Sequence, residues 1–334
     1  MDSNKKNFRT FQSKTPYRVS LFGGGTDLPS YFNNYEGEVL GFSINYFCNI
    51  FLRRLPPFFE YKYRIVYSKI ELQNEVKKII HPTIRNSFLK FKINTPFELH
   101  HHGDLPARSG LGSSSSFTVG LLALISKINN LSLTRKQISK NAFEIERNLN
   151  NETVGYQDQI FASHGGFLNI KFKKKNEFKI NAINLSKKNL KKFEDSCSLF
   201  FTGFSRYASN IESDKEKKIL NKIKYYNNLK EVCREGVKVF KEKNLDIKKI
   251  GELLQTNWQA KKNLSDLVSS NDIDNIIDDG ISIGAYGAKL LGAGGGGFVL
   301  FISSSDIKKK LIKYFNKLVY VPFKIYDHGV EVSE

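Results

Sequence analysis

The chain has 334 residues, of which 40% are hydrophobic, so it is long enough to bury a core and favours two domains over one. No run of about 18 uncharged apolar residues occurs, and the polar start MDSNKKNFRTFQSK lacks the apolar segment of a signal peptide. Its three cysteines are far apart, which argues against a disulfide framework or a zinc site. We therefore expect a cytoplasmic protein with no membrane contact.

The formal net charge is +19, which favours association with polyanions. The lysines are nevertheless spread among acidic residues along the whole chain and form no basic tail. Dispersed charge of this kind is typical of biased composition more than of a nucleic-acid interface. We expect a small phosphorylated substrate and no nucleic-acid partner, and the sequence makes no prediction of the oligomeric state.

The first half of the chain alternates between strand and helix patterns. β-branched and aromatic residues predict strands at 15–22, 37–53, 63–69 and 97–103. Helical periodicity follows at 117–128 and 134–148, and apolar alternation on both sides of a charged tip predicts a hairpin over 165–185.

The second half begins with a predicted strand at 198–202. Apolar residues then recur every three or four positions over 213–242, on a charged background, which predicts one long amphipathic helix. The remaining predicted elements are a helix at 247–267, a strand at 298–303, a helix at 306–316 and a strand at 318–325. We expect an α+β fold with two domains, 1–190 and 191–334.

One stretch, PARSGLGSSSSF at 106–117, places two glycines and a run of serines directly before an apolar helix. Gly110 and Gly112 let successive N–H groups converge, and Ser113–Ser116 lead into the first turn of the helix. The positive end of a helix dipole favours an anion there, and a nucleotide phosphate is a common one. A flexible serine-rich turn with an ordinary helix cap is the alternative, and GxxxxGK[ST] is absent.

A second stretch, KLLGAGGGGFVLF at 289–301, formally contains GxGxxG. A strand pattern follows it, whereas a dinucleotide-binding motif requires a helix there. Four consecutive glycines beside a buried strand indicate that something passes very close to the backbone, although a glycine-rich hairpin is the alternative.

A third stretch, TPYRVSLFGGGTDLPSYF at 15–32, carries Arg18 on a predicted strand and Asp27 in the loop after three glycines. Alone, these two residues could form a surface ion pair. Together, in this order, the three stretches resemble the three motifs of the GHMP kinases, the family of galactokinase, homoserine kinase and mevalonate kinase. The first motif is matched by Pro16, Arg18, Val19, Leu21, Gly23, Thr26 and Asp27, the second by Pro106, Gly110, Leu111, Gly112, Ser113, Ser114 and Ser115, and the third by Lys289 and Gly292–Gly297.

This resemblance spans nearly the whole chain. It implies an N-terminal domain like domain 2 of ribosomal protein S5, a ferredoxin-like C-terminal domain, and ATP bound in the cleft between them. The second GHMP motif is expected to bind the nucleotide, through Pro106, Gly110, Leu111, Gly112, Ser113, Ser114, Ser115 and Ser116.

The resemblance also implies catalytic roles. Ser114 and Glu146 match the serine and glutamate that bind magnesium in the family, with Glu144 as the fallback for the glutamate. Asp158 matches the aspartate that activates the acceptor hydroxyl, and Arg18 is expected to pair with it and to stabilise developing charge. Mg²⁺ prefers hard oxygen ligands and bridges the nucleotide phosphates.

The pattern of the first motif bears on the acceptor. Gly24 and Gly25 stand where galactokinase-like members have Glu-His, which implies a roomier pocket, while Asp27 is kept for a sugar hydroxyl. The segments FGGGTDLPSYF, GYQDQ and GAYGAKLLGAGGGGF look most like D-glycero-D-manno-heptose 7-phosphate kinases. These kinases phosphorylate the anomeric hydroxyl to give the 1,7-bisphosphate, on the route to GDP-heptose for bacterial capsule, lipopolysaccharide or S-layer glycans.

A phosphorylated acceptor needs cationic partners, and the planar fork of arginine suits a phosphate. Arg206 is the first candidate for the 7-phosphate and Arg108 the second, and Gly294 and Gly295 are expected to line the acceptor pocket.

Two other functions remain open from sequence. One keeps the chemistry and changes the acceptor to a free sugar such as fucose or galactose, because motifs constrain specificity weakly. The other is a catalytically silent sensor or RNA-associated protein, against which the joint presence of Asp158, Glu146 and the serine run argues.

Overall fold

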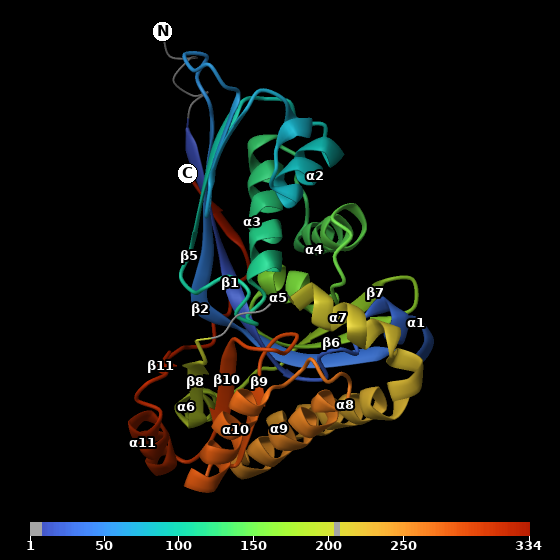
Figure 1. The fold of residues 1–334 in the computed structure, drawn as a ribbon, viewed down its shortest axis with the longest axis vertical. Coiled ribbons are helices and arrows are strands. Elements are labelled where there is room, and N and C mark those ends of the chain that lie inside the picture. The colour runs from blue at the N-terminus through green and yellow to red at the C-terminus, as the bar shows by residue number, and fades with distance from the viewer. Residues whose placement is uncertain (1–8, 204–207) are drawn as a thin grey trace.

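The fold contains two β-sheets, each covered by helices (Figure 1). A computed structural model describes residues 9–203 and 208–334. The larger sheet has eight strands, with β1 and β2 forming a long antiparallel pair at its centre. Its strands are β1 (Thr10–Phe22), β2 (Gly37–Arg54), β3 (Tyr63–Val66), β4 (Ile70–Gln73), β5 (Phe97–Gly103), β6 (Phe167–Lys173), β7 (Glu177–Ala182) and β12 (Glu331–Ser333).

Helix α3 (Ser113–Ile128) runs along one face of this sheet, with α2 (Pro82–Lys90) and α4 (Arg135–Glu144) beside it (Figure 1). The sequence of α3 is apolar on almost every side, and all of its residues from Ser115 to Ser126 are buried. A helix of this kind must be covered all round, which fixes it in the core of the domain. Two shorter helices lie next to motif residues. α1 (Pro29–Tyr35) follows the loop that contains Asp27, and α5 (Gln157–His164) carries Asp158 in its first turn.

The smaller sheet is antiparallel, in the order β11-β8-β10-β9. Its strands are β8 (Cys197–Phe201), β9 (Gly287–Leu290), β10 (Phe298–Ile302) and β11 (Val319–Tyr320). The helices of this half are α6 (Lys187–Ser196), α7 (Ala208–Lys217), α8 (Ile219–Phe240), α9 (Ile247–Lys262), α10 (Asn271–Ile283) and α11 (Ser305–Tyr314). The predicted α+β class is therefore confirmed.

Two predicted elements differ from the structure. The helix expected over 213–242 is divided into α7 and α8, because Lys218 leaves the helical conformation with φ −95° and ψ 1°. The strand expected over 318–325 is shorter than predicted: β11 pairs with β8 at Val319 and Tyr320, and the Val321 N–H donates to the Leu199 carbonyl at 2.8 Å. Pro322 follows, and since proline has no N–H it cannot continue a sheet ladder.

The end of the chain returns to the larger sheet. Ile325 forms a bridge with Ile44, and β12 pairs antiparallel with β1. The C-terminus consequently lies beside β1 in Figure 1, away from the smaller sheet. The second half of the chain thus contributes a strand to the first sheet as well as forming the second.

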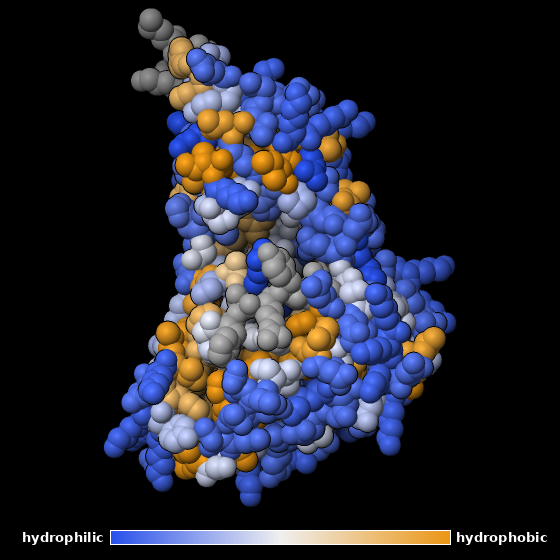
Figure 2. All heavy atoms as spheres, in the orientation of Figure 1, coloured by the Kyte–Doolittle hydropathy of each residue, from blue (hydrophilic) through white to orange (hydrophobic). Residues whose placement is uncertain are grey.

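The face shown in Figure 2 is mostly hydrophilic, with hydrophobic side chains in separate groups. Within residues 9–203 and 208–334, no helix is both long and apolar enough to span a membrane.

Candidate active site

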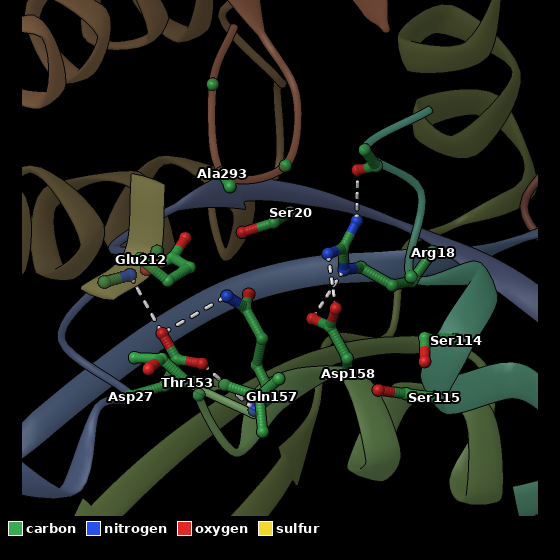
Figure 3. A pocket seen from close by; sticks show the side chains of 18 of the residues that line it. Arg18, Ser20, Asp27, Ser114, Ser115, Thr153, Gln157, Asp158, Glu212 and Ala293 are labelled. Carbon is green, nitrogen blue, oxygen red and sulfur yellow. Dashed lines mark hydrogen bonds and ion pairs between the residues drawn. The ribbon is translucent and has the colours of Figure 1, made fainter. Parts of the chain in front are cut away.

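A cavity of about 190 Å³ lies where the three motif stretches meet (Figure 3). One wall is the loop after β1, which includes Gly24, Gly25 and Asp27. The second is the serine loop (residues 106–116), and the third is the glycine loop (residues 292–297). Residues 152–158, α7 and the ends of α9 and β9 complete the lining. Segments more than 250 residues apart in sequence, such as Arg18 and Gly296, thus share one cavity.

Arg18 and Asp158 face each other in this cavity (Figure 3). Nε and Nη2 of Arg18 donate to the two carboxylate oxygens of Asp158 at 2.8 and 2.6 Å, and Nη1 donates to the Gly110 carbonyl at 2.6 Å. Arg18 is buried on β1, while Asp158, in the first turn of α5, keeps 23% of its side chain exposed. This two-pronged pairing fixes the carboxylate in one orientation at the cavity surface.

Asp27 lies at the other side of the cavity, next to Gln157 (Figure 3). It accepts hydrogen bonds from the Gly25 N–H at 2.8 Å, the Gln157 N–H at 3.2 Å and the Gln157 amide at 3.2 Å. Burial, together with the charge of Asp158, raises the pKa of Asp27 to about 6. At Gly155 a Cβ atom would lie only 2.0 Å from the Asp27 carboxylate, so that position requires glycine.

The serine loop approaches the ion pair closely. Gly112 adopts a left-handed φ of 77° at the start of α3, and a Cβ there would lie 3.2 Å from Arg18 Cγ and 3.4 Å from Asp158 Oδ2. Gly110, Gly112 and Ser113–Ser115 line the cavity, so the N-terminal turn of α3 and its free N–H groups open into it.

Three other predicted nucleotide-binding residues lie off this surface. Leu111 is fully buried in the hydrophobic core, and the Ser116 hydroxyl donates to the Pro16 carbonyl at 2.9 Å. Pro106 is not among the cavity residues. The structure therefore gives Leu111 and Ser116 a packing role in holding the loop against β1.

The structure places a different serine beside Glu146 from the one predicted to bind magnesium. Ser114 lines the cavity, but the hydroxyl that donates to Glu146 Oε2 belongs to Ser115, at 2.8 Å. Glu146 is fully buried in a π-helical turn (Ile145–Leu149) and also accepts from Gln159 Nε2 at 2.6 Å. Glu144, the fallback, forms an ion pair with Lys90 at 2.6 Å and is 46% exposed.

Glu146 has the properties of a metal ligand. Its Oε1 atom is buried without a hydrogen-bond partner, and burial raises the pKa of its carboxyl to about 7. A buried carboxylate oxygen that lacks a donor is stabilised by a cation, and Mg²⁺ takes carboxylate and hydroxyl oxygens. The serine run and Glu146 therefore fit Mg²⁺, although a metal site built from three or more His, Cys, Asp or Glu residues is absent from the described part of the chain.

The glycine loop packs against the serine loop. A Cβ atom on Gly292 would lie 2.3 Å from Gly110 Cα, and one on Gly297 would lie 2.2 Å from the Ser109 carbonyl oxygen. What passes close to these glycines is thus the chain's own backbone. Gly294 lines the cavity as expected, whereas Gly295 lies off its lining and donates its N–H to the Val268 carbonyl at 2.9 Å.

Of the two arginines expected to bind a second phosphate, Arg108 lines the cavity and Arg206 falls outside the described residues. Sequence reasoning missed several other lining side chains, namely Ser20, Thr153, Gln157, Glu212, Lys215 and Lys261, and it gave Lys289 no role. Lys289 matches the third motif, and that match could have identified it as a candidate site residue. In a chain with 52 Lys and Arg residues, nothing local distinguishes Lys215 or Lys261.

Comparison with known proteins identifies the family. The family profile for the GHMP kinases N terminal domain matches residues 74–166, and that for the GHMP kinases C terminal domain matches residues 238–320. The chain is 32% identical over 325 residues to the D-glycero-alpha-D-manno-heptose 7-phosphate kinase of Campylobacter jejuni, covering 92% of this chain and 94% of the relative. The chain belongs to the GHMP kinases. The predicted family is therefore confirmed.

Other GHMP kinases are more distant relatives. The mevalonate kinase of Methanocaldococcus jannaschii is 29% identical over 232 residues, which cover 69% of each chain. The solved structure of a D-glycero-D-manno-heptose 1-phosphate kinase from Bacteroides thetaiotaomicron matches with a TM-score of 0.80 at 22% identity, covering 97% of this chain and 99% of that one. The predicted two-domain GHMP kinase fold is confirmed by these matches, and ATP is the phosphoryl donor of the family.

Proposed function

We propose that this GHMP kinase transfers the γ-phosphoryl group of ATP, with Mg²⁺, to the anomeric hydroxyl of D-glycero-D-manno-heptose 7-phosphate, forming the 1,7-bisphosphate. The observation that carries the proposal is the Arg18–Asp158 pair, which lies in one cavity with the serine loop and Asp27. The similarity over 92% of the chain to a heptose 7-phosphate kinase supports the choice of acceptor. The product would feed GDP-heptose synthesis for a bacterial surface glycan.

The proposed reaction begins with the acceptor hydroxyl at Asp158. The carboxylate accepts the hydroxyl proton while the oxygen forms a bond to the γ-phosphorus and the bond from that phosphorus to the ADP oxygen breaks. Arg18 holds the carboxylate by two hydrogen bonds of 2.6 and 2.8 Å and supplies positive charge beside the transferring group. Asp27 accepts hydrogen bonds from other sugar hydroxyls.

The serine loop serves the nucleotide in this proposal. Gly110, Gly112 and the N–H groups at the start of α3 hold the phosphates of ATP. Ser114, Ser115 and Glu146 would hold Mg²⁺, which would supply positive charge against the phosphates of the nucleotide.

The direct test is ATP turnover with Mg²⁺ against D-glycero-D-manno-heptose 7-phosphate, the unphosphorylated heptose, fucose, galactose and mevalonate. We expect turnover of the heptose 7-phosphate, and a fall in kcat of about 100- to 10,000-fold in Asp158→Asn, because the variant cannot take the proton. Unchanged thermal unfolding would separate this loss from misfolding.

Asp104→Asn is a matched control. Asp104 accepts a hydrogen bond from the Phe47 N–H at 2.7 Å and lies outside the cavity lining. ATP turnover by the Asp104→Asn variant should therefore equal that of the wild type. Turnover of a free sugar alone would overturn the proposed acceptor. Absence of turnover with every acceptor would favour a sensor without catalysis.

A further inference from the structure

Three lysines are buried in the wall of the cavity, and the mechanism above does not use them. Lys215 on α7, Lys261 on α9 and Lys289 on β9 all line the cavity, yet their exposed fractions are only 2%, 4% and 2%. Lysine is almost never buried to this degree unless its charge is paired. The cluster therefore requires an explanation beyond packing.

Carbonyl oxygens are the main partners of these ammonium groups. Lys289 Nζ donates to the carbonyls of Ser20 and Leu21, both at 2.9 Å. Lys261 Nζ donates to the carbonyls of Leu290, at 3.2 Å, and Gly292. Each ammonium group has three N–H donors, so each of these lysines keeps one for another partner.

Lys215 alone in this cluster pairs with a carboxylate among the described residues. Its Nζ donates to Glu212 Oε1 at 2.6 Å and to the Ala293 carbonyl at 3.3 Å. Among the described residues, one carboxylate is thus hydrogen-bonded to the three ammonium groups, and the charge of Asp27 also acts on Lys289. Buried charge without a counter-ion is costly, and an anion in the cavity would offset that cost.

The electrostatics of the cluster would favour the binding of an anion. Burial, and next the charge of Arg18, lowers the pKa of Lys289 to about 7. Burial and the neighbouring Lys289 hold the pKa of Lys261 well below its ordinary value. An anion bound between these groups would favour their charged forms.

The position of the three lysines favours a role in binding the acceptor over a role in binding the nucleotide. The N–H of Arg18 donates to Leu111 of the serine loop at 3.0 Å, so the nucleotide side of the cavity meets β1 at Arg18. The carbonyls that hold Lys289 belong to Ser20 and Leu21, further along β1 toward Asp27.

We propose that Lys215, Lys261 and Lys289 form a subsite for a phosphate group that the acceptor already carries. Of the cationic side chains that line the described cavity, Arg18 is engaged with Asp158 and Arg108 belongs to the serine loop. The three lysines are left for a second phosphate. This inference rests on the proposed function and assigns the 7-phosphate to lysines in place of Arg206 or Arg108.

The test uses Lys261→Met and Lys289→Met, which keep an apolar stem and remove the charge. We expect kcat/KM for the heptose 7-phosphate, at saturating MgATP, to fall by about 10- to 100-fold, the loss of one or two hydrogen bonds to a charged group. The kcat/KM for unphosphorylated heptose should fall much less, so the preference for the phosphorylated sugar shrinks.

The matched control is Lys262→Met, the next residue along α9. Lys262 is 31% exposed and pairs with Asp274 at 2.8 Å, away from the cavity. Its preference for the phosphorylated sugar should equal that of the wild type. Thermal unfolding checks that each variant is folded, because the carbonyls of Ser20 and Leu21, or of Leu290 and Gly292, lose a donor and lower the stability of the variant.

Other outcomes would overturn the inference. An equal loss for both sugars would give the lysines a structural role. A raised KM for ATP, with the preference between the sugars unchanged, would place them on the phosphates of the nucleotide.

Calorimetric titration with inorganic phosphate separates this inference from the proposed function. If the wild type binds phosphate and Lys261→Met does not, while neither protein turns over heptose 7-phosphate, the subsite stands and the proposed acceptor is wrong. If wild type and variant turn over the sugar phosphate equally well, the subsite is wrong and the proposed acceptor stands.

Discussion

At the scale of single residues, Glu146 shows how the site trades stability for chemistry. It is fully buried, its Oε2 accepts from Ser115 and Gln159, and its Oε1 has no donor. A carboxylate placed in this way favours its protonated form until a cation arrives. Its pKa, raised to about 7 by burial, follows from that arrangement.

The pH dependence of stability follows from the raised pKa. The folded protein holds the Glu146 proton up to about pH 7, whereas an unfolded chain releases it near pH 4. The free energy of unfolding therefore falls as the pH rises through this window. We predict that Glu146→Gln, which keeps the acceptor oxygen, is more stable than the wild type at pH 8 by on the order of 3 kcal/mol.

Thermal unfolding without Mg²⁺ at pH 4.5 and pH 8 measures this difference. The advantage of Glu146→Gln should be largest at pH 8 and should nearly vanish at pH 4.5. Glu144→Gln is the control, because Glu144 is 46% exposed and its ion pair with Lys90 is expected to contribute little. A Glu146→Gln protein that is less stable than wild type at pH 8 would contradict this interpretation.

Much of this site could be predicted from the residue types in the motifs. Arg18 and Asp27 were found in the first of three ordered motifs, and Asp158 was found through the resemblance to the GHMP kinases; the structure places all three in one cavity. Ser115 as the partner of Glu146 was missed, because four serines in a row leave the rotation of the helix undetermined. The burial of Lys215, Lys261 and Lys289 was not predicted either, because burial depends on tertiary packing.

At the scale of elements, the serine loop and the glycine loop depend on each other. Gly292 and Gly110 are in backbone contact, and φ at Gly292 is 73°. This contact couples the positions of the two loops, although Gly110 and Gly292 are 182 positions apart in the sequence.

We predict that Gly292→Ala lowers kcat/KM for both ATP and the acceptor, because the new Cβ would lie 2.3 Å from Gly110 Cα and must push the loops apart. Gly166→Ala is the matched control. Gly166 has a similar φ of 79°, but a Cβ there has no neighbour closer than 3.6 Å. The control should show only the strain of about 1 kcal/mol that a left-handed residue brings. Equal activity and equal thermal stability of the two variants would contradict the proposed loop contact.

Elements were predictable where the pattern was local and long. The strands β1, β2 and β5 and the helix α3 fall within the predicted ranges or extend them by a few residues. The helices α1, α2, α5, α6 and α10 were missed. α1 and α2 each begin with a proline and have too few turns to show a period, so their packing decides their conformation.

At the scale of the whole molecule, the cavity exists only because two sheets are brought together. β1 and α3 of the first half supply Arg18 and the serine loop, while the second half supplies the glycine loop and the three buried lysines, on α7, α9 and β9. Order along the chain predicted the family and the two-domain fold. It could not predict that residues 331–333 return to pair with β1, because that pairing depends on contacts between the two ends of the chain.

The measurement that tests the central proposal most directly is ³¹P NMR of the wild-type protein incubated with ATP, Mg²⁺ and D-glycero-D-manno-heptose 7-phosphate. We predict that ADP forms together with one new phosphate resonance coupled to the anomeric proton, while the 7-phosphate resonance persists. Formation of ADP with free phosphate alone, or no consumption of ATP, would contradict the proposed transfer to the sugar.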